Sequence, residues 1–125
     1  MLDHVSIGVR DLPASRRFYD TVLATLGYRC LYQDDAYAGY GDAYPQFWIN
    51  ASEAPVPADE RSGLHVCFAA HNRAAVDAFH AAALAGGGSD NGKPDLRPEY
   101  TPTYYAAFAK DLDGYRIEAH CEVPA

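Results

Sequence analysis

Two segments of the sequence, residues 4–27 and 65–88, share one layout at a fixed offset of 61 residues. Seven of 24 aligned positions are identical without a gap, from His4-Val5 over His65-Val66 to Gly27 over Gly88. Each segment reads as a strand, a cap, an amphipathic helix and a glycine stop. Because a repeat at a fixed period indicates duplicated structural units, we expect two similar modules related by a pseudo-twofold axis. Each module carries a histidine at the same place.

The rest of each copy reads mainly as strands and turns. After the first helix, three short strands rich in aromatic residues are expected at 28–33, 36–41 and 46–50. After the second helix, strands are expected at 103–109 and 115–121, with an Asp-Gly turn between them. Residues 89–102 hold many turn formers and are expected to be a mobile loop with a weak strand near Leu96. The modules are assigned to 1–54 and 62–125, within a single domain of 125 residues.

Composition excludes several classes of partner. The formal net charge is −7, and the ten Lys and Arg residues are scattered, which argues against nucleic acid. No apolar stretch approaches the roughly 20 residues that span a bilayer. Three cysteines, without zinc-ribbon spacing, fit reduced thiols. With no basic and apolar leader at the amino terminus, we expect a cytoplasmic protein that acts on a small molecule.

Side-chain alternation brings polar groups to one surface. If the apolar faces of the sheets pack on the helices, the opposite faces enclose a cup lined by His4, Ser6, His65, Cys67 and Glu118. Two imidazoles and a carboxylate form a set that suits Fe, Mn, Ni or Zn and leaves open positions for substrate. The alternative is a hydrogen-bonded triad without metal.

Several motifs then point to a family. They are Asp3 to Leu12, Ser15 to Tyr19, Gly27-Tyr28, Gly63 to Val66, and Asp111 to Glu118. Together they resemble the vicinal oxygen chelate superfamily, which contains glyoxalase I, fosfomycin-resistance enzymes, extradiol dioxygenases and bleomycin-resistance proteins. The resemblance covers nearly the whole chain, and its motifs occur in the expected order.

The resemblance implies an α+β fold of two βαβββ modules that form a cup-shaped mixed sheet, usually in a homodimer. It assigns the first-strand metal ligand to His4, the fifth-strand ligand to His65 and the last-strand carboxylate to Glu118. The sequence departs from glyoxalase I on the fourth strand, where Trp48 takes the place of a further glutamate. The four-ligand glyoxalase I site is therefore not expected, and the specific reaction does not carry over.

These observations favour an enzyme that binds one divalent ion (Zn, Ni, Mn, Co or Fe) and a small substrate with two adjacent oxygens. Glu118 is the candidate catalytic residue for proton transfer. The candidate substrate-binding residues are Trp48, Cys67, Lys93, Arg97, Tyr104 and Tyr105. The alternative is a binding protein that sequesters a drug without catalysis, as bleomycin-resistance proteins do. A structural or regulatory domain is a third class, and no sequence feature favours it.

Overall fold

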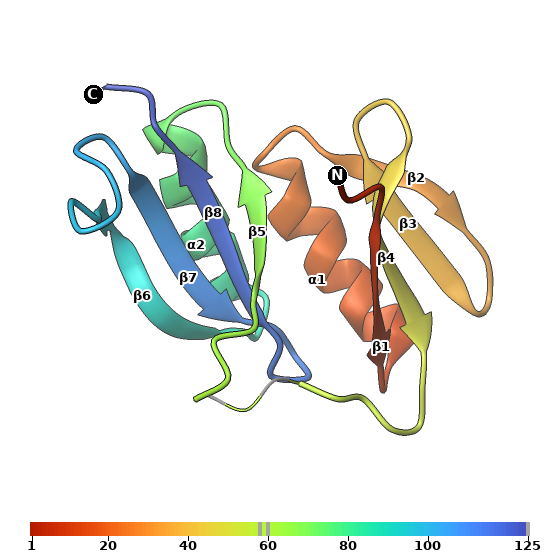
Figure 1. Ribbon diagram of the computed structural model, residues 1–125. Coiled ribbons are helices and arrows are strands. Elements are labelled where there is room, and N and C mark those ends of the chain that lie inside the picture. Colours follow the sequence, from red (N-terminus) through yellow and green to blue (C-terminus); the bar gives the residue numbers. More distant parts are fainter. Residues whose placement is uncertain (58, 60, 125) are drawn as a thin grey trace.

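The computed structural model describes residues 1–57, 59 and 61–124. Two βαβββ units follow each other along the chain (Figure 1). The first contains β1 (Val5–Val9), α1 (Leu12–Ala24), β2 (Arg29–Gln33), β3 (Tyr37–Gly41) and β4 (Pro45–Ala51). The second contains β5 (Val66–Ala69), α2 (Arg73–Ala85), β6 (Ser89–Leu96), β7 (Tyr105–Lys110) and β8 (Arg116–Cys121). The α+β fold with two four-stranded sheets confirms the expected architecture.

The helices reproduce the repeat at its full offset. α1 begins at Leu12 and α2 at Arg73, so that both helices of 13 residues are 61 positions apart. The side chains of Asp11 and Asn72 each accept a hydrogen bond from the backbone N–H three residues later, as helix caps do. Gly27 follows α1 with a φ of 85°, a conformation that glycine adopts without steric cost. The sequence therefore sets both ends of each helix locally.

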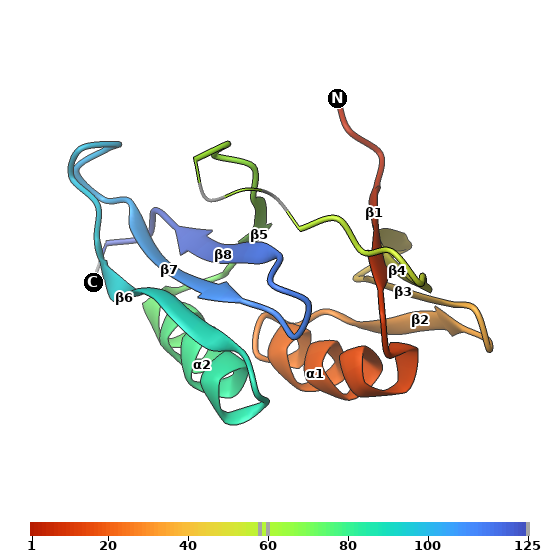
Figure 2. The same ribbon diagram turned by 90° about the horizontal axis from the view of Figure 1, so that it is seen from below.

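Each sheet is mixed, and its strands have equivalent orders. The first runs β1-β4-β3-β2 and the second β5-β8-β7-β6, with β1 parallel to β4, β5 parallel to β8, and antiparallel pairing elsewhere. Both helices lie on the same side of the two sheets, as Figure 2 shows, and the opposite side is left open. β1 and β5 are the inner edge strands, and no strand pairing joins them in the described residues.

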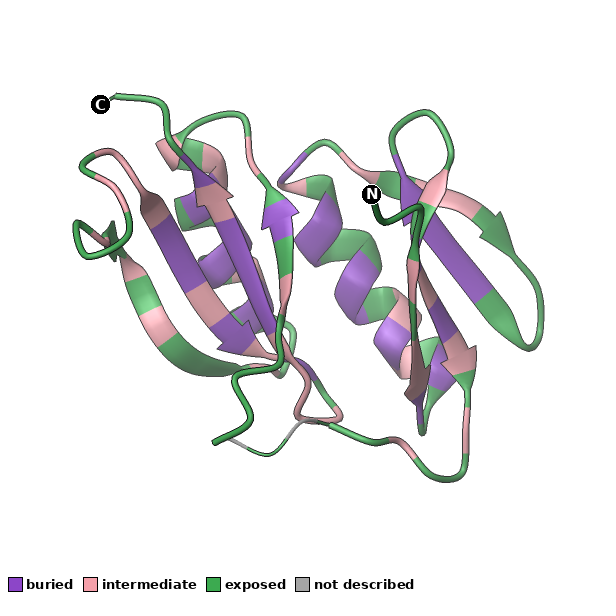
Figure 3. Cartoon of the chain, viewed as in Figure 1, coloured by how far each residue is buried: buried purple, intermediate pink, exposed green. Residues whose placement is uncertain are grey.

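The apolar core fills the space between the helices and the sheets and continues from one unit into the other. Buried residues line the inner sides of both helices and the central strands (Figure 3). Phe47 on β4 meets Phe68 on β5 edge to face, with 5.1 Å between ring centroids. The buried hydroxyl of Tyr19 donates to Asp111 Oδ2 across the two units at 2.5 Å. Apolar packing and a buried polar contact thus fix the two units against each other.

The segment 89–102 differs from its expected loop. Its first eight residues form β6, which pairs with β7 through two register shifts around Gly92. The strand has no buried residue and contains Pro94, which an edge strand tolerates. Because an exposed, bulged edge strand lacks apolar alternation, the sequence pattern gave only the weak strand signal near Leu96, which lies at the end of β6. Separately, none of the described helices is long and apolar enough to cross a membrane.

Candidate functional site

The central residue of the site is Glu118, whose side chain is 2% exposed on β8 between β5 and β7. Its Oε1 lies 2.8 Å from His65 Nε2. Its Oε2 accepts a hydrogen bond of 2.7 Å from the Tyr104 hydroxyl. Each carboxylate oxygen therefore has one partner, as a buried carboxylate requires.

His65 lies one residue before β5 and is oriented through its second nitrogen. Its Nδ1 lies 3.0 Å from the Gly63 carbonyl oxygen. Because a carbonyl oxygen only accepts, this contact assigns a proton to Nδ1, and the 2.8 Å contact of Nε2 with Glu118 Oε1 needs a further proton between those two atoms. This role of Gly63 was not predicted from the sequence. Gly63 has a φ of 77°, a conformation that glycine adopts without steric cost, and its position two residues before His65 is the sequence feature that accompanies the contact.

Cys67 is the residue of β5 directly opposite Glu118 in the parallel pair with β8. Burial, followed by the neighbouring Glu118 carboxylate, raises the pKa of the Cys67 thiol to about 12. The thiol is therefore protonated at neutral pH and acts as a small apolar wall beside the carboxylate.

Tyr104 is held between two rings. His120 stacks on it with centroids 3.8 Å apart, and Tyr100 meets it edge to face at 5.0 Å. Burial and the hydrogen bond to Glu118 raise the pKa of Tyr104, so that its hydroxyl keeps the proton that it donates. Tyr104 was a candidate substrate contact, and the structure places its hydroxyl on the Glu118 carboxylate.

His4 lies apart from this cluster. It precedes β1, its side chain is 52% exposed, and its Nδ1 lies 2.8 Å from Asp3 Oδ1. Within the described part of the chain, no three His, Cys, Asp or Glu side chains lie close enough together to hold one metal ion. The structure thus brings together two of the three expected metal ligands, His65 and Glu118, and separates the third.

Two further candidate residues have different relations to this site. The guanidinium of Arg97 lies over the Phe108 ring at 5.3 Å, and that ring lies 6.2 Å from the His65 ring. Trp48 occupies the fourth-strand position opposite Ser6, as Glu118 does opposite Cys67, and packs on Tyr32. Arg97 therefore packs on the ring next to His65, and Trp48 stands at the position of the first unit that is equivalent to Glu118.

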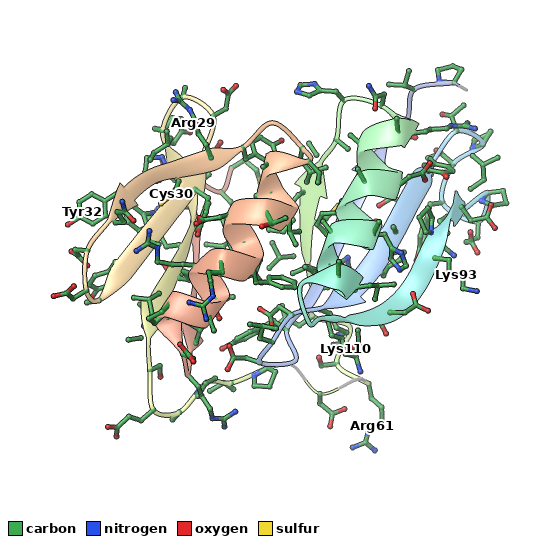
Figure 4. All side chains as sticks on the ribbon, turned by 180° about the vertical axis from the view of Figure 1, so that it is seen from behind. Arg29, Cys30, Tyr32, Arg61, Lys93 and Lys110 are labelled. Carbon is green, nitrogen blue, oxygen red and sulfur yellow. The ribbon has the colours of Figure 1, made fainter. Side chains whose placement is uncertain are left out.

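Two candidate residues face elsewhere. The Tyr105 hydroxyl donates to Asp77 of α2 at 2.6 Å, which puts this side chain on the helix side of the sheet. Lys93 extends from the outer part of β6, away from the body of the molecule (Figure 4). In this conformation, the side chains of Tyr105 and Lys93 both lie away from Glu118.

A cavity of about 440 Å³ adjoins the site between the inner edge strands. His65 lines it from one side and Ser6, Gly8 and Asn50 from the other. Arg116 also lines it and holds the segment before β5 through the Leu64 and Asp59 carbonyl oxygens. The volume lies within the usual range for small-molecule sites.

Comparison with known proteins gives the family. Residues 1–119 match the model of the glyoxalase/bleomycin resistance protein/dioxygenase superfamily. The chain belongs to this superfamily. No curated protein matches it. Among solved structures, a glyoxalase/bleomycin resistance protein from Albidiferax ferrireducens T118 is 33% identical, with a TM-score of 0.85 over 96% of this chain and 98% of that chain.

Two more distant structures share the superfamily fold. A family enzyme from Burkholderia phytofirmans PsJN is 19% identical, with a TM-score of 0.71 over 97% of this chain and 98% of that chain. A V278E mutant of glyoxalase I from Zea mays is 21% identical, with a TM-score of 0.72 over 95% of this chain and 45% of that chain. At these identities the likeness concerns the fold alone.

Proposed function

We propose that this chain is a divalent-metal-dependent enzyme of the vicinal oxygen chelate superfamily that acts on a small substrate through two adjacent oxygens. The observation that carries the proposal is the arrangement of His65 Nε2 and Glu118 Oε1, 2.8 Å apart. The other nitrogen of His65 faces a backbone carbonyl oxygen, and the other oxygen of Glu118 accepts from Tyr104. Outer partners of this kind are typical of metal ligands, because they fix the tautomer and the carboxylate orientation.

The two donor atoms fit neighbouring positions around one ion. Ligand atoms about 2.1 Å from a metal and at right angles to each other are about 3.0 Å apart, close to the spacing in this site. An imidazole nitrogen and a carboxylate oxygen suit Zn, Ni, Mn, Co or Fe. Within one chain the donor set has two members, so a third protein ligand has to come from elsewhere.

We assign the third ligand to His4 of a second copy, which makes the functional unit a homodimer. Three observations support this assignment. The imidazole of His4 is half exposed. β1 and β5 each have one free edge at the inner side of their sheets, and free strand edges are usually covered. Large apolar side chains near them are exposed, with Leu2 at 79% and Leu64 at 65%.

Residues of this chain also define the chemistry of the proposed reaction. The bound ion would supply Lewis-acid stabilisation of negative charge on a substrate oxygen. Glu118 moves a proton in an isomerase or lyase step, and the Tyr104 hydroxyl stabilises its carboxylate form. Substrate lies in the 440 Å³ cavity that His65 and Arg116 line.

The second candidate function is a binding protein that sequesters a small molecule without catalysis. The specific observation in its favour is that Glu118 is already paired with His65 and Tyr104, so the cluster is satisfied without a metal. This candidate predicts ligand binding that is independent of metal.

Metal binding provides the first test. After reconstitution, elemental analysis should find about one metal ion per chain. Tyr104→Phe should weaken metal affinity by about 10- to 100-fold, because it removes the donor that orients Glu118. Tyr100→Phe is the matched control, since the ring of Tyr100 packs on Tyr104 but its hydroxyl makes no contact with Glu118. Equal affinities for the two variants would remove the assigned role of Tyr104.

A thermal-shift screen separates enzyme from binding protein. Catechols, 2-oxoacids, epoxide phosphonates and thiol adducts of 2-oxoaldehydes are tested with and without chelator. A ligand at 100 times its Kd should stabilise the folded protein by about 2.7 kcal/mol, and this gain should vanish with chelator and in His65→Ala. Strong stabilisation by a bulky glycopeptide drug that persists with chelator would favour the sequestering protein.

A further inference from the structure

A second cavity, of about 320 Å³, lies between the same two inner edge strands but extends toward the other end of β5. It shares Val5 and Val66 with the larger cavity and continues to Ala69. Because β1 and β5 are not paired, the gap reaches down to core side chains of both units. This cavity does not include His65 or Glu118 in its lining.

Apolar and aromatic side chains form the walls of this cavity. Phe47 and Phe68, which pack edge to face, belong to its lining together with the buried Leu23. Tyr28 spans the gap, and its hydroxyl donates to the Ala69 carbonyl oxygen at 2.8 Å. Rings from two units and a fixed crossing tyrosine give a preformed space for a flat apolar group.

The charges around the cavity are mainly negative. No Lys, Arg or His lines it, within the described residues. Asp20 accepts from the hydroxyl of the lining residue Tyr40 at 2.8 Å, and Glu118 lies beside the lining residue Cys67. The pKa of the Tyr28 hydroxyl is raised mainly by burial and, to a smaller extent, by the nearby charge of Asp42. Two cations also lie near: Arg16, whose influence on Tyr40 is weaker than that of Asp20, and Arg29, which follows Tyr28 and stands opposite the lining residue Gly41.

We propose that this cavity is a second small-molecule site, which takes a compact aromatic ring carrying a neutral or positively charged amine and rejects the corresponding carboxylate. The aromatic walls bind the ring, and the faces of Tyr28 and Phe47 attract a cation. Acidic groups behind the walls and the net charge of −7 disfavour an anion. The site is independent of the metal proposed above, although both adjoin Cys67.

Three ligands with one ring system test the charge preference. Calorimetric titration compares tryptamine, indole and indole-3-acetate at pH 7. Tryptamine should bind at least about tenfold more tightly than indole-3-acetate, with indole between them. Binding should be unchanged by chelator and in His65→Ala, so that failure of the metal proposal leaves this one standing. Equal affinity for the amine and the acid, or the absence of binding by all three, overturns the proposal.

A substitution that fills the cavity tests whether tryptamine binds there. Ala69→Leu replaces a methyl by an isobutyl group at an exposed lining residue of β5 and leaves the backbone acceptor of Tyr28 in place. Tryptamine affinity should fall at least about tenfold. Ala36→Leu makes the same change in the exposed turn between β2 and β3 and should leave the affinity unchanged. If Ala69→Leu folds, as judged by its thermal transition, and binds tryptamine as wild type does, the site is not this cavity.

Discussion

His4→Ala and His65→Ala homodimers should each lose the metal, and a mixed dimer of the two variants should recover about one ion per dimer. The reason is geometric. In one of the two shared sites of the mixed dimer, an intact His4 from one copy meets an intact His65 and Glu118 from the other. The second site carries both substitutions and stays empty. The mixed dimer is isolated with two different affinity tags and measured by elemental analysis.

This measurement also separates the alternatives for the third ligand. If His4 joined the site of its own chain, every site of the mixed dimer would carry one substitution and no metal would return. If His4 were not a ligand, the His4→Ala homodimer would keep its metal. His71→Ala is the matched control, because His71 is an exposed histidine before α2, and this variant should bind metal normally. Light scattering that gave the monomer mass would contradict the shared site itself.

Asp111→Ala should destabilise the folded protein by about 2–4 kcal/mol, which lowers Tm on the order of 10 °C. Asp111 is 6% exposed and accepts from the buried Tyr19 hydroxyl and from the backbone N–H groups of Asp113 and Tyr115. Its removal leaves buried donors without an acceptor where the two units meet. Urea unfolding measures the loss.

The pH dependence of this loss follows from the direction of the pKa shift. Burial raises the pKa of Asp111 above its usual value of 3.8. A group whose folded-state pKa is raised contributes most below its unfolded pKa and less as pH rises through the folded value. The loss in Asp111→Ala should therefore be larger near pH 4 than at pH 8. Asp35→Ala, in the exposed β2–β3 turn, should change stability by less than about 0.5 kcal/mol at both pH values.

Most of the fold was readable from the sequence because its signals are local. Asp11 and Asn72 cap the helices, Gly27 ends the first, and the 61-residue offset holds for both helices in the structure. Side-chain alternation predicted Cys67 and Glu118 on one face of the sheet, and the register of β5 and β8 places them opposite each other. The exception is β6, since an exposed edge strand with Gly92 and Pro94 needs its partner β7 to form.

The duplicated βαβββ units, the superfamily and the residue types of the site could all be predicted from sequence patterns. Which of these residues meet depends on the packing of the sheets. His65 and Glu118 face each other because β5 and β8 pair in register, and Tyr104 joins them from the residue before β7. His4 is on the expected face of its strand but lies apart from Glu118, whereas Tyr105 alternates to the helix side of β7, where its hydroxyl contacts Asp77. The physical reason is that alternation fixes the face of a strand, whereas the distance between side chains on different strands depends on how the sheets pack.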